Sequence, residues 1–367
     1  MKLGIDARLI SQTGVGVYTR NLLYYLQDYV PRDWEVNVYL KKVDYESFGF
    51  GTKRFNKRLA DIHWHTFSEQ TAFYKMLQRD NLDLMHFTYF SYPAMYRRPF
   101  VSTIHDLTPL LYKTGKASTH HTLYYEVKHM GLKLVLSELM RRSAAVITPS
   151  NAVRGEILQT FGARYADKVV AIYEGLDESL VDLKENEKLS KQLPHDFFVY
   201  VGNFYPHKNV EKLVEAYRLV DTKIPLILVG PEDHFAGRIQ KHIESLGMQN
   251  QILVHTKSSR NDLVYFYNHA KALIHPSLAE GFGLTLLEAA FFGCPIIASD
   301  IPVIREMLGD EYVAFDPLFT TDMTEKIEHF IEKRRRFDYK KIVKKYSFDQ
   351  MAKETVEVYK KVVDNIK

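Results

Sequence analysis

The stretch that decides the fold is residues 275–300, HPSLAEGFGLTLLEAAFFGCPIIASD. The apolar run 272–274 just before it predicts a buried strand, and the glycine loop Gly281-Phe-Gly283 follows. Residues 284–292 are good helix formers, and the glycine and proline after them form a usual stop signal. Residues 295–298 are short, apolar and β-branched at the centre, which suits a parallel strand buried on both faces. The order strand, glycine loop, helix and strand predicts an α/β fold with a parallel sheet.

The same stretch places polar groups where a nucleotide would bind. A glycine loop that opens a helix offers free backbone amides, and the positive end of the helix dipole favours phosphate. Glu280 stands just ahead of the loop, and Glu288 lies one to two turns into the expected helix. Amides for a diphosphate and carboxylates for hydroxyls predict a nucleotide-sugar site. The alternative is an ordinary glycine turn with a glutamate nearby, which many α/β proteins have.

The whole string resembles the signature of the retaining glycosyltransferases of family 4, which have the GT-B fold. The pieces that match in order and spacing are PS-x-x-EGFGL, LEA, G-x-PII-x-SD and a following glutamate, Glu306. The resemblance covers essentially the whole chain. It implies two Rossmann-like domains that face a central cleft, with a C-terminal helix crossing back to the N-terminal domain. It also implies transfer of a hexose from a nucleoside diphosphate to an acceptor hydroxyl, with retention of configuration by front-face substitution.

The resemblance also implies which residues form the site. By it, Glu280 holds sugar hydroxyls near the reacting carbon, Glu288 holds the ribose, and His105 contacts the sugar or acceptor. Lys208 lies in GNFYPHKN, similar to the family's G-x-x-x-P-R-K-N, and its charge binds the donor diphosphate. The other implied contacts are Gly16, Phe282, Gly283 and Leu284 for the diphosphate, and Asn203, His207 and Asp106 for the donor or acceptor.

Many relatives carry a basic residue at the position of Asn203 or at that of His207. This chain therefore has less fixed positive charge for the leaving group than those relatives have. This difference from the relatives affects how strongly the diphosphate is expected to bind, but the expected location of the diphosphate site is unchanged.

A second glycine loop, ending at Gly16, lies between a strand expected at residues 2–6 and a helix expected at residues 17–29. In family members a similar loop approaches the donor diphosphate from the N-terminal domain. Thr19 occupies the third glycine position of the dinucleotide fingerprint, so a Rossmann dehydrogenase is only weakly supported.

His105-Asp106 follows an expected strand at residues 100–104. Ligands of open α/β sheets gather at the carboxyl ends of strands, although a single His-Asp pair is more often structural than catalytic. The segment TIHDLTPLLY looks like the family's H-D-L-x-P lining of the acceptor cleft. Further on, Glu174-Gly-Leu-Asp177 resembles the family's N-G-x-D turn at the domain junction, with Glu174 in place of asparagine.

A chain of 367 residues is longer than the length at which a single hydrophobic core stops growing, so two domains are expected. Residues 1–172, together with the C-terminal helix 347–367, should form an acceptor-binding domain, and residues 173–346 a nucleotide-sugar-binding domain. The charged segment 182–191 is expected to be the linker, and the basic segment 53–58 a solvated loop. Further strands of the first domain are expected at residues 35–40, 62–65, 84–87 and 145–148.

Charge and composition narrow the class of protein. Residues 1–172 hold 23 Lys+Arg against 15 Asp+Glu, whereas the remainder holds 26 against 30. A basic first half suits an anionic acceptor or membrane face, or is scatter over a solvated surface. The acidic second half argues against a nucleic-acid partner. The sequence has a single cysteine, Cys294, and shows no apolar leader or membrane span. These features predict a cytoplasmic protein, which could also bind the inner face of the membrane.

No metal or other cofactor is expected. The histidines His120, His121 and His129 lie in an amphipathic stretch, residues 118–142, without cysteine or carboxylate clusters at ligand spacing. A surface helix near the acceptor is favoured over a metal site. The chain also lacks an Asp-x-Asp motif for a divalent cation, as is usual in the GT-B fold.

The sequence therefore predicts a glycosyltransferase that moves mannose from GDP-mannose to a glycan or lipid-linked acceptor in surface polysaccharide synthesis, such as an O-antigen. The alternatives are a transferase that uses UDP-glucose, UDP-galactose or UDP-GlcNAc, a GT-B nucleotide-sugar epimerase, and a non-catalytic nucleotide-binding protein. Product analysis without acceptor would separate an epimerase from a transferase. The presence of both glutamates and Lys208 argues against a non-catalytic protein.

Overall fold

A computed structural model describes residues 1–112, 122–333 and 335–365 of the chain. These residues fall into two compact units. The first contains residues 1–110, 122–175 and 347–365, and the second contains residues 111–112 and the described part of 176–346. The chain thus passes from one unit to the other after Gly175 and returns at Ser347.

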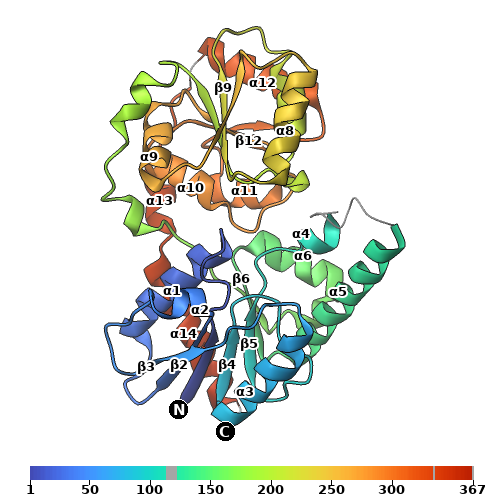
Figure 1. Cartoon of the computed structure of the whole chain (residues 1–367), viewed down its shortest axis with the longest axis vertical. Coiled ribbons are helices and arrows are strands. Elements are labelled where there is room, and N and C mark those ends of the chain that lie inside the picture. The colour runs from blue at the N-terminus through green and yellow to red at the C-terminus, as the bar shows by residue number, and fades with distance from the viewer. Residues whose placement is uncertain (113–121, 334, 366–367) are drawn as a thin grey trace. The chain divides into compact units, whose positions relative to one another are not determined.

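The first unit is built on a seven-stranded parallel sheet with the order β3-β2-β1-β4-β5-β6-β7 (Figure 1). Its strands are β1 (Lys2–Asp6), β2 (Glu35–Leu40), β3 (Phe55–Leu59), β4 (Leu84–Phe87), β5 (Phe100–Thr103), β6 (Ala145–Thr148) and β7 (Val169–Ala171). Its helices are α1 (Val15–Tyr29), α2 (Lys42–Tyr45), α3 (Tyr74–Asp80), α4 (Thr108–Leu111), α5 (Thr122–Arg142), α6 (Asn151–Phe161) and α14 (Phe348–Asp364). The strand order reverses between β1 and β4, where open α/β sheets place their ligands.

The C-terminal helix α14 belongs to the first unit, as expected, although the sequence that precedes it belongs to the second. It packs along α1 (Figure 1). The Tyr29 hydroxyl of α1 donates a hydrogen bond of 2.7 Å to Asp349 of α14. Apolar side chains of α14 such as Met351, Val356 and Tyr359 are buried, as the helical spacing of its apolar residues requires.

The second unit has a six-stranded parallel sheet with the order β10-β9-β8-β11-β12-β13. Its strands are β8 (Phe198–Val201), β9 (Leu226–Gly230), β10 (Ile252–Thr256), β11 (Leu273–His275), β12 (Ile296–Ser299) and β13 (Val313–Phe315). Its helices are α7 (Val210–Tyr217), α8 (His234–Ser245), α9 (Arg260–His269), α10 (Leu284–Phe291), α11 (Pro302–Leu308), α12 (Thr320–Lys333) and α13 (Lys340–Lys345). The strand order reverses between β8 and β11, so the loops after these two strands are neighbours.

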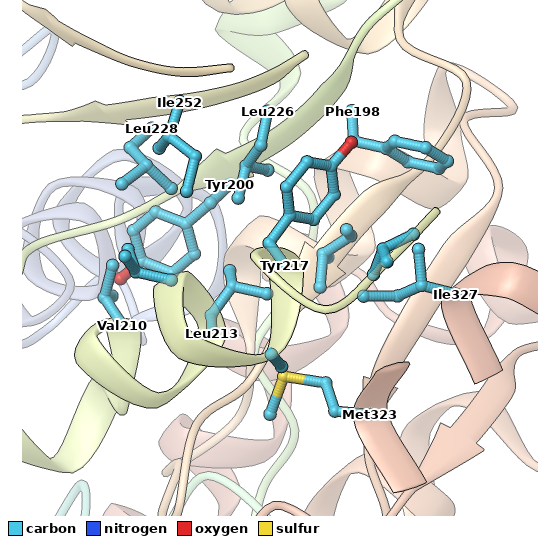
Figure 2. Close-up of a cluster of buried hydrophobic side chains, with 14 of the residues drawn as sticks. Phe198, Tyr200, Val210, Leu213, Tyr217, Leu226, Leu228, Ile252, Met323 and Ile327 are labelled. Atoms are coloured by element: carbon cyan, nitrogen blue, oxygen red, sulfur yellow. The ribbon is translucent and has the colours of Figure 1, made fainter. Parts of the chain in front are cut away.

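A cluster of buried side chains holds the second sheet against its helices (Figure 2). Phe198 and Tyr200 of β8 meet Leu213 and Tyr217 of α7, and Met323 of α12 closes the cluster. Fully burying one such side chain contributes about 1.5–3 kcal/mol. Because α7 directly follows the loop that carries Lys208, this cluster also fixes the end of that loop.

Three expectations for local structure are wrong. The segment expected as a basic loop contains β3, an edge strand whose residues from Asn56 onward are partly or fully exposed, so basic side chains can point to water. Residues 62–65 form no strand, and His65 has the left-handed φ of 56°. The expected linker packs on α9 instead, since Asn186 donates a hydrogen bond of 2.7 Å to Asp262.

Among the helices of the described residues, none has both the length and the apolar composition needed to cross a bilayer.

Candidate functional site

The reversal of strand order in the second unit brings Lys208 and Glu280 together. Lys208 ends the short helical turn Pro206–Lys208 after β8, and Glu280 lies in the loop after β11. The Leu278 amide donates a hydrogen bond of 2.8 Å to the His207 carbonyl, which joins the two loops. Lys208 Nζ lies 2.6 Å from Glu280 Oε1. Two residues 72 positions apart in sequence therefore form one ion pair at the expected donor site.

His275 is a further partner of the same carboxylate. Its Nε2 lies 2.6 Å from Glu280 Oε1, the oxygen that Lys208 also contacts, and 3.0 Å from Ser277 Oγ. Burial raises the pKa of Glu280, but the Lys208 charge and the contact with His275 outweigh it, so the pKa lies well below its ordinary value. Glu280 is therefore a carboxylate at neutral pH. Sequence reasoning missed His275 and Ser277, whose only signal was their place in the segment ahead of Glu280.

The amides expected to bind the diphosphate lie at the start of α10. Gly283 is the N-cap residue, with φ of 101°, a conformation that side chains other than glycine rarely adopt. Glycine has no side chain to cap the helix, and the Leu286 and Leu287 amides donate to the Gly283 carbonyl, so the amides of Leu284 and Thr285 are the ones that keep their capacity to bind an anion. Phe282 is buried against Tyr346, with ring centroids 5.2 Å apart, and so anchors the loop.

Glu288 lies further along α10 and has a different environment from Glu280. The Tyr267 hydroxyl of α9 donates a hydrogen bond of 2.8 Å to Glu288 Oε2. Burial raises the pKa of Glu288 to about 7, against smaller opposing effects of the Tyr267 hydrogen bond and the Arg260 charge. The two glutamates expected at the site thus differ in charge state, since Glu280 is ionised at neutral pH and Glu288 is only partly so.

The pKa of Glu288 predicts a pH-dependent loss of stability. The folded protein holds this proton up to about pH 7, whereas an unfolded glutamate releases it near its ordinary pKa of 4.5. The stabilising contribution is complete below the unfolded pKa and is lost as the pH rises through about 7. Glu288→Gln removes the titration, so at pH 8 we expect the variant to exceed the wild type by about 1–3 kcal/mol in unfolding free energy.

Denaturant unfolding at pH 5 and pH 8 measures this difference. The exposed Glu332 of α12 offers a matched control, because Glu332→Gln removes a carboxylate that water solvates. A constant difference between Glu288→Gln and the wild type over the whole pH range would contradict the prediction.

The remaining residues expected in the second unit lie in the Lys208 loop. The Asn203 side chain accepts a hydrogen bond of 3.3 Å from the Tyr205 amide, and its carbonyl accepts one from the Tyr200 hydroxyl. His207 meets the Glu280 loop through its carbonyl. Both residues therefore shape the loop that presents Lys208.

In the first unit, His105 is buried and both of its ring nitrogens have partners. Nε2 lies 3.0 Å from the Thr88 carbonyl, and Nδ1 lies 3.2 Å from Glu174 Oε1. The Tyr18 ring and the imidazole pack nearly perpendicular to each other, with centroids 4.8 Å apart. A direct bond from His105 to a sugar or acceptor hydroxyl would have to replace one of these two contacts. The glutamate at position 174, where the family motif has asparagine, is thus a partner of His105.

The other two expected residues of the first unit have structural contacts. Asp106 Oδ1 accepts a hydrogen bond of 2.7 Å from the Thr108 amide at the start of α4. Gly16 lies in the first turn of α1, where a Cβ atom would come within 2.5 Å of the Ile10 carbonyl oxygen. Glycine is therefore required at position 16 by the close approach of the backbone after β1.

Within the described part of the chain, no group of three or more histidine, cysteine, aspartate or glutamate side chains could hold a metal ion. His120 and His121 lie outside the described residues. Cys294 is buried, and burial raises its pKa to about 12, which fits a packed thiol rather than a nucleophile.

Known proteins resemble this chain along nearly its whole length. The O-antigen chain mannosyltransferase RfbU of Salmonella typhimurium is 28% identical over 298 residues, covering 80% of this chain and 78% of that protein. The sucrose-phosphate synthase of Thermosynechococcus elongatus has a TM-score of 0.72 at 16% identity, with 100% and 97% of the two chains covered. Anabaena HepE, solved in complex with UDP and glucose, has a TM-score of 0.68 at 19% identity, with 100% and 98% covered.

Two family models account for the two halves of the chain. The model described as Glycosyltransferase Family 4 matches residues 12–180, and the model described as Glycosyl transferases group 1 matches residues 182–348. The parallel sheets of both units and the solved neighbours confirm the expected GT-B fold of two Rossmann-like domains. The chain therefore belongs to the family 4 glycosyltransferases and is similar to bacterial mannosyltransferases.

Proposed function

We propose that this protein transfers mannose from GDP-mannose to a hydroxyl of a glycan or lipid-linked acceptor, with retention of configuration, in surface polysaccharide synthesis. The observation that carries the proposal is the Lys208–Glu280 pair in the same unit as the uncapped start of α10. These groups supply a cation, amides and a carboxylate, which suit the diphosphate and sugar of one donor. The similarity to an O-antigen mannosyltransferase supports mannose as the sugar.

The mechanism rests on positioning and charge. Lys208 and the first amides of α10 stabilise the negative charge that grows on the departing diphosphate. Glu280 accepts hydrogen bonds from sugar hydroxyls and favours the positive charge that develops on the sugar ring, while Glu288 binds the ribose. The acceptor attacks from the face that the diphosphate leaves, and the diphosphate takes the acceptor proton. His105 lines the acceptor side through the packing of its ring.

A UDP-sugar is the second candidate donor. It is favoured by the similarity of the fold to HepE, whose solved complexes contain UDP-glucose or UDP and glucose. Thermal unfolding with GDP-mannose, UDP-glucose, UDP-galactose and UDP-GlcNAc separates the two. A donor at 100 times its Kd stabilises the folded protein by about 2.7 kcal/mol. We expect GDP-mannose to give the largest shift, and a larger shift with a UDP-sugar would overturn the choice of base.

Activity is expected to need no divalent cation, because Lys208 and helix amides neutralise the diphosphate. Turnover of the donor selected by unfolding should stay within about twofold in the presence of excess chelator, since no metal supplies transition-state stabilisation. The comparison is made on protein purified without added metal, with and without the chelator. A strict requirement for magnesium or manganese would contradict the proposed diphosphate contacts.

The proposal includes a cytoplasmic location with the first unit at the inner membrane face. The described end of α5 exposes Met130 and Leu134, four residues apart, with the exposed Lys133 between them. Apolar side chains beside basic ones suit a membrane with anionic lipids. Sedimentation with anionic vesicles should exceed sedimentation with neutral ones, and Leu134→Glu should reduce it. Equal sedimentation with both vesicle types would remove the membrane from the proposal.

A further inference from the structure

His275 occupies a place that the expected donor contacts do not explain. It is the last residue of β11, is 2% exposed, and directs Nε2 to Glu280 Oε1 at 2.6 Å. The ring of Tyr200 lies nearly parallel to the imidazole, with centroids 6.4 Å apart. A polar ring is therefore packed into the end of the strand, with one nitrogen on the carboxylate that the mechanism assigns to the sugar.

The contacts of the ring decide which nitrogen carries the proton. Nδ1 is buried and has no hydrogen-bond partner among the described residues. A proton on Nδ1 would leave a buried donor unpaired, and a bare Nε2 would point its lone pair at a carboxylate oxygen. A proton on Nε2 alone avoids both penalties, since Nε2–H donates to Glu280 with Ser277 Oγ beside it. The geometry thus selects the tautomer with the proton on Nε2.

Lys208 and His275 both contact Oε1 of Glu280, but the Lys208 side chain can move away from it more easily. The Lys208 side chain is long and 16% exposed, whereas the His275 side chain is 3% exposed and extends from a strand. When the ammonium group turns to a donor diphosphate, His275 remains as the donor to Oε1. Within the described part of the chain, Glu280 Oε2 receives no hydrogen bond, so it is the oxygen left for a ligand.

We propose that His275 is the positioning residue of Glu280: its Nε2–H fixes Oε1 of the carboxylate and so presents Oε2 to the hydroxyls of the transferred sugar. The inference rests on the proposed function and deepens it. It assigns to His275 the orientation of Glu280 in the donor-bound protein, where Lys208 serves the diphosphate.

Two amide substitutions test this role. The side-chain nitrogen of glutamine is as many bonds from the backbone as Nε2 of histidine. The side-chain nitrogen of asparagine is as many bonds from the backbone as Nδ1. His275→Gln should therefore keep kcat within about threefold, whereas His275→Asn should lose about 10-fold to 100-fold in kcat, as for a charged hydrogen bond. The donor KM and the Kd of the nucleoside diphosphate should change by less than about threefold in both variants, because Lys208 and the amides are untouched.

Equal activity of the two variants at equal melting temperature would overturn the positioning role, as would a loss that appears in KM alone. A fall in kcat that follows the melting temperatures would indicate a purely structural residue and would also overturn it.

A second measurement does not depend on turnover. Nitrogen NMR of protein labelled in its histidines should show a protonated Nε2 and an unprotonated Nδ1 for His275. The His275 signal is identified as the one that is missing from the spectrum of His275→Gln. A protonated Nδ1 would overturn the inference even if sugar transfer is confirmed. If no nucleotide-sugar is turned over, the proposed function fails, and the NMR result still decides how His275 holds Glu280.

Discussion

Glu280→Gln is expected to lower kcat and kcat/KM together by about 10-fold to 100-fold, the range for loss of a charged hydrogen bond. Glutamine keeps the size of the side chain but removes the charge that favours a cationic sugar in the transition state. An interaction made mainly in the transition state affects kcat and kcat/KM alike. The donor KM should not rise, because Lys208 loses its ion-pair partner and becomes more available to the diphosphate.

Glu288→Gln, in the helix α10 that follows the Glu280 loop, is the matched comparison. The ribose is remote from the breaking bond, so this variant should act on the donor KM and leave kcat within about threefold. Steady-state kinetics of both variants with the same donor, beside their melting temperatures, makes the comparison. Normal turnover in Glu280→Gln with a loss of kcat in Glu288→Gln would reverse the two assignments.

Lys208→Ala is expected to weaken binding of the nucleoside diphosphate by at least about 1.5–3 kcal/mol, which is the value for a charged hydrogen bond. The substitution also leaves the Glu280 carboxylate, now held by His275 alone, without its cation. An unneutralised negative charge near the diphosphate opposes binding, so the loss should reach or exceed the upper part of this range. Calorimetric titration with the diphosphate measures the affinity directly.

Lys212 provides a control for the loss of one positive charge. It lies on α7 in the same unit, and its ammonium group contacts the Leu318 carbonyl at 2.7 Å rather than a carboxylate. Lys212→Ala should leave the affinity unchanged within about 0.5 kcal/mol, as for surface substitutions. An unchanged affinity in Lys208→Ala would place the phosphate site elsewhere.

The elements around residues 275–300 were predictable because their signals are local. Gly283 and Gly293 bound an apolar helix, and β11 and β12 occur within one or two residues of their expected positions. The segments of Lys208 and Glu280 could each be found from their similarity to a family motif. Their meeting depends on the strand order, since β8 and β11 are adjacent only after the chain has formed two strands on the other side.

The features that sequence reasoning missed depend on tertiary contacts. His275 ends an apolar strand, and nothing in its neighbours indicates that its Nε2 meets Glu280. Glu174 was noted only as a departure from asparagine, whereas it pairs with His105 from 69 residues away. The many charged residues of segment 182–191 predicted a linker, but Asn186 of this segment is hydrogen-bonded to Asp262 of α9.

The central claim is sugar transfer from a nucleoside diphosphate with retention of configuration. The most direct test is NMR of the first product formed from GDP-α-mannose, read from the carbon–proton coupling at the anomeric carbon. We expect an α-linked mannoside, formed in the presence of chelator and formed about 10-fold to 100-fold more slowly by Glu280→Gln. A β-linked product would contradict the mechanism, and no product from any nucleotide-sugar, whatever the acceptor, would contradict the function.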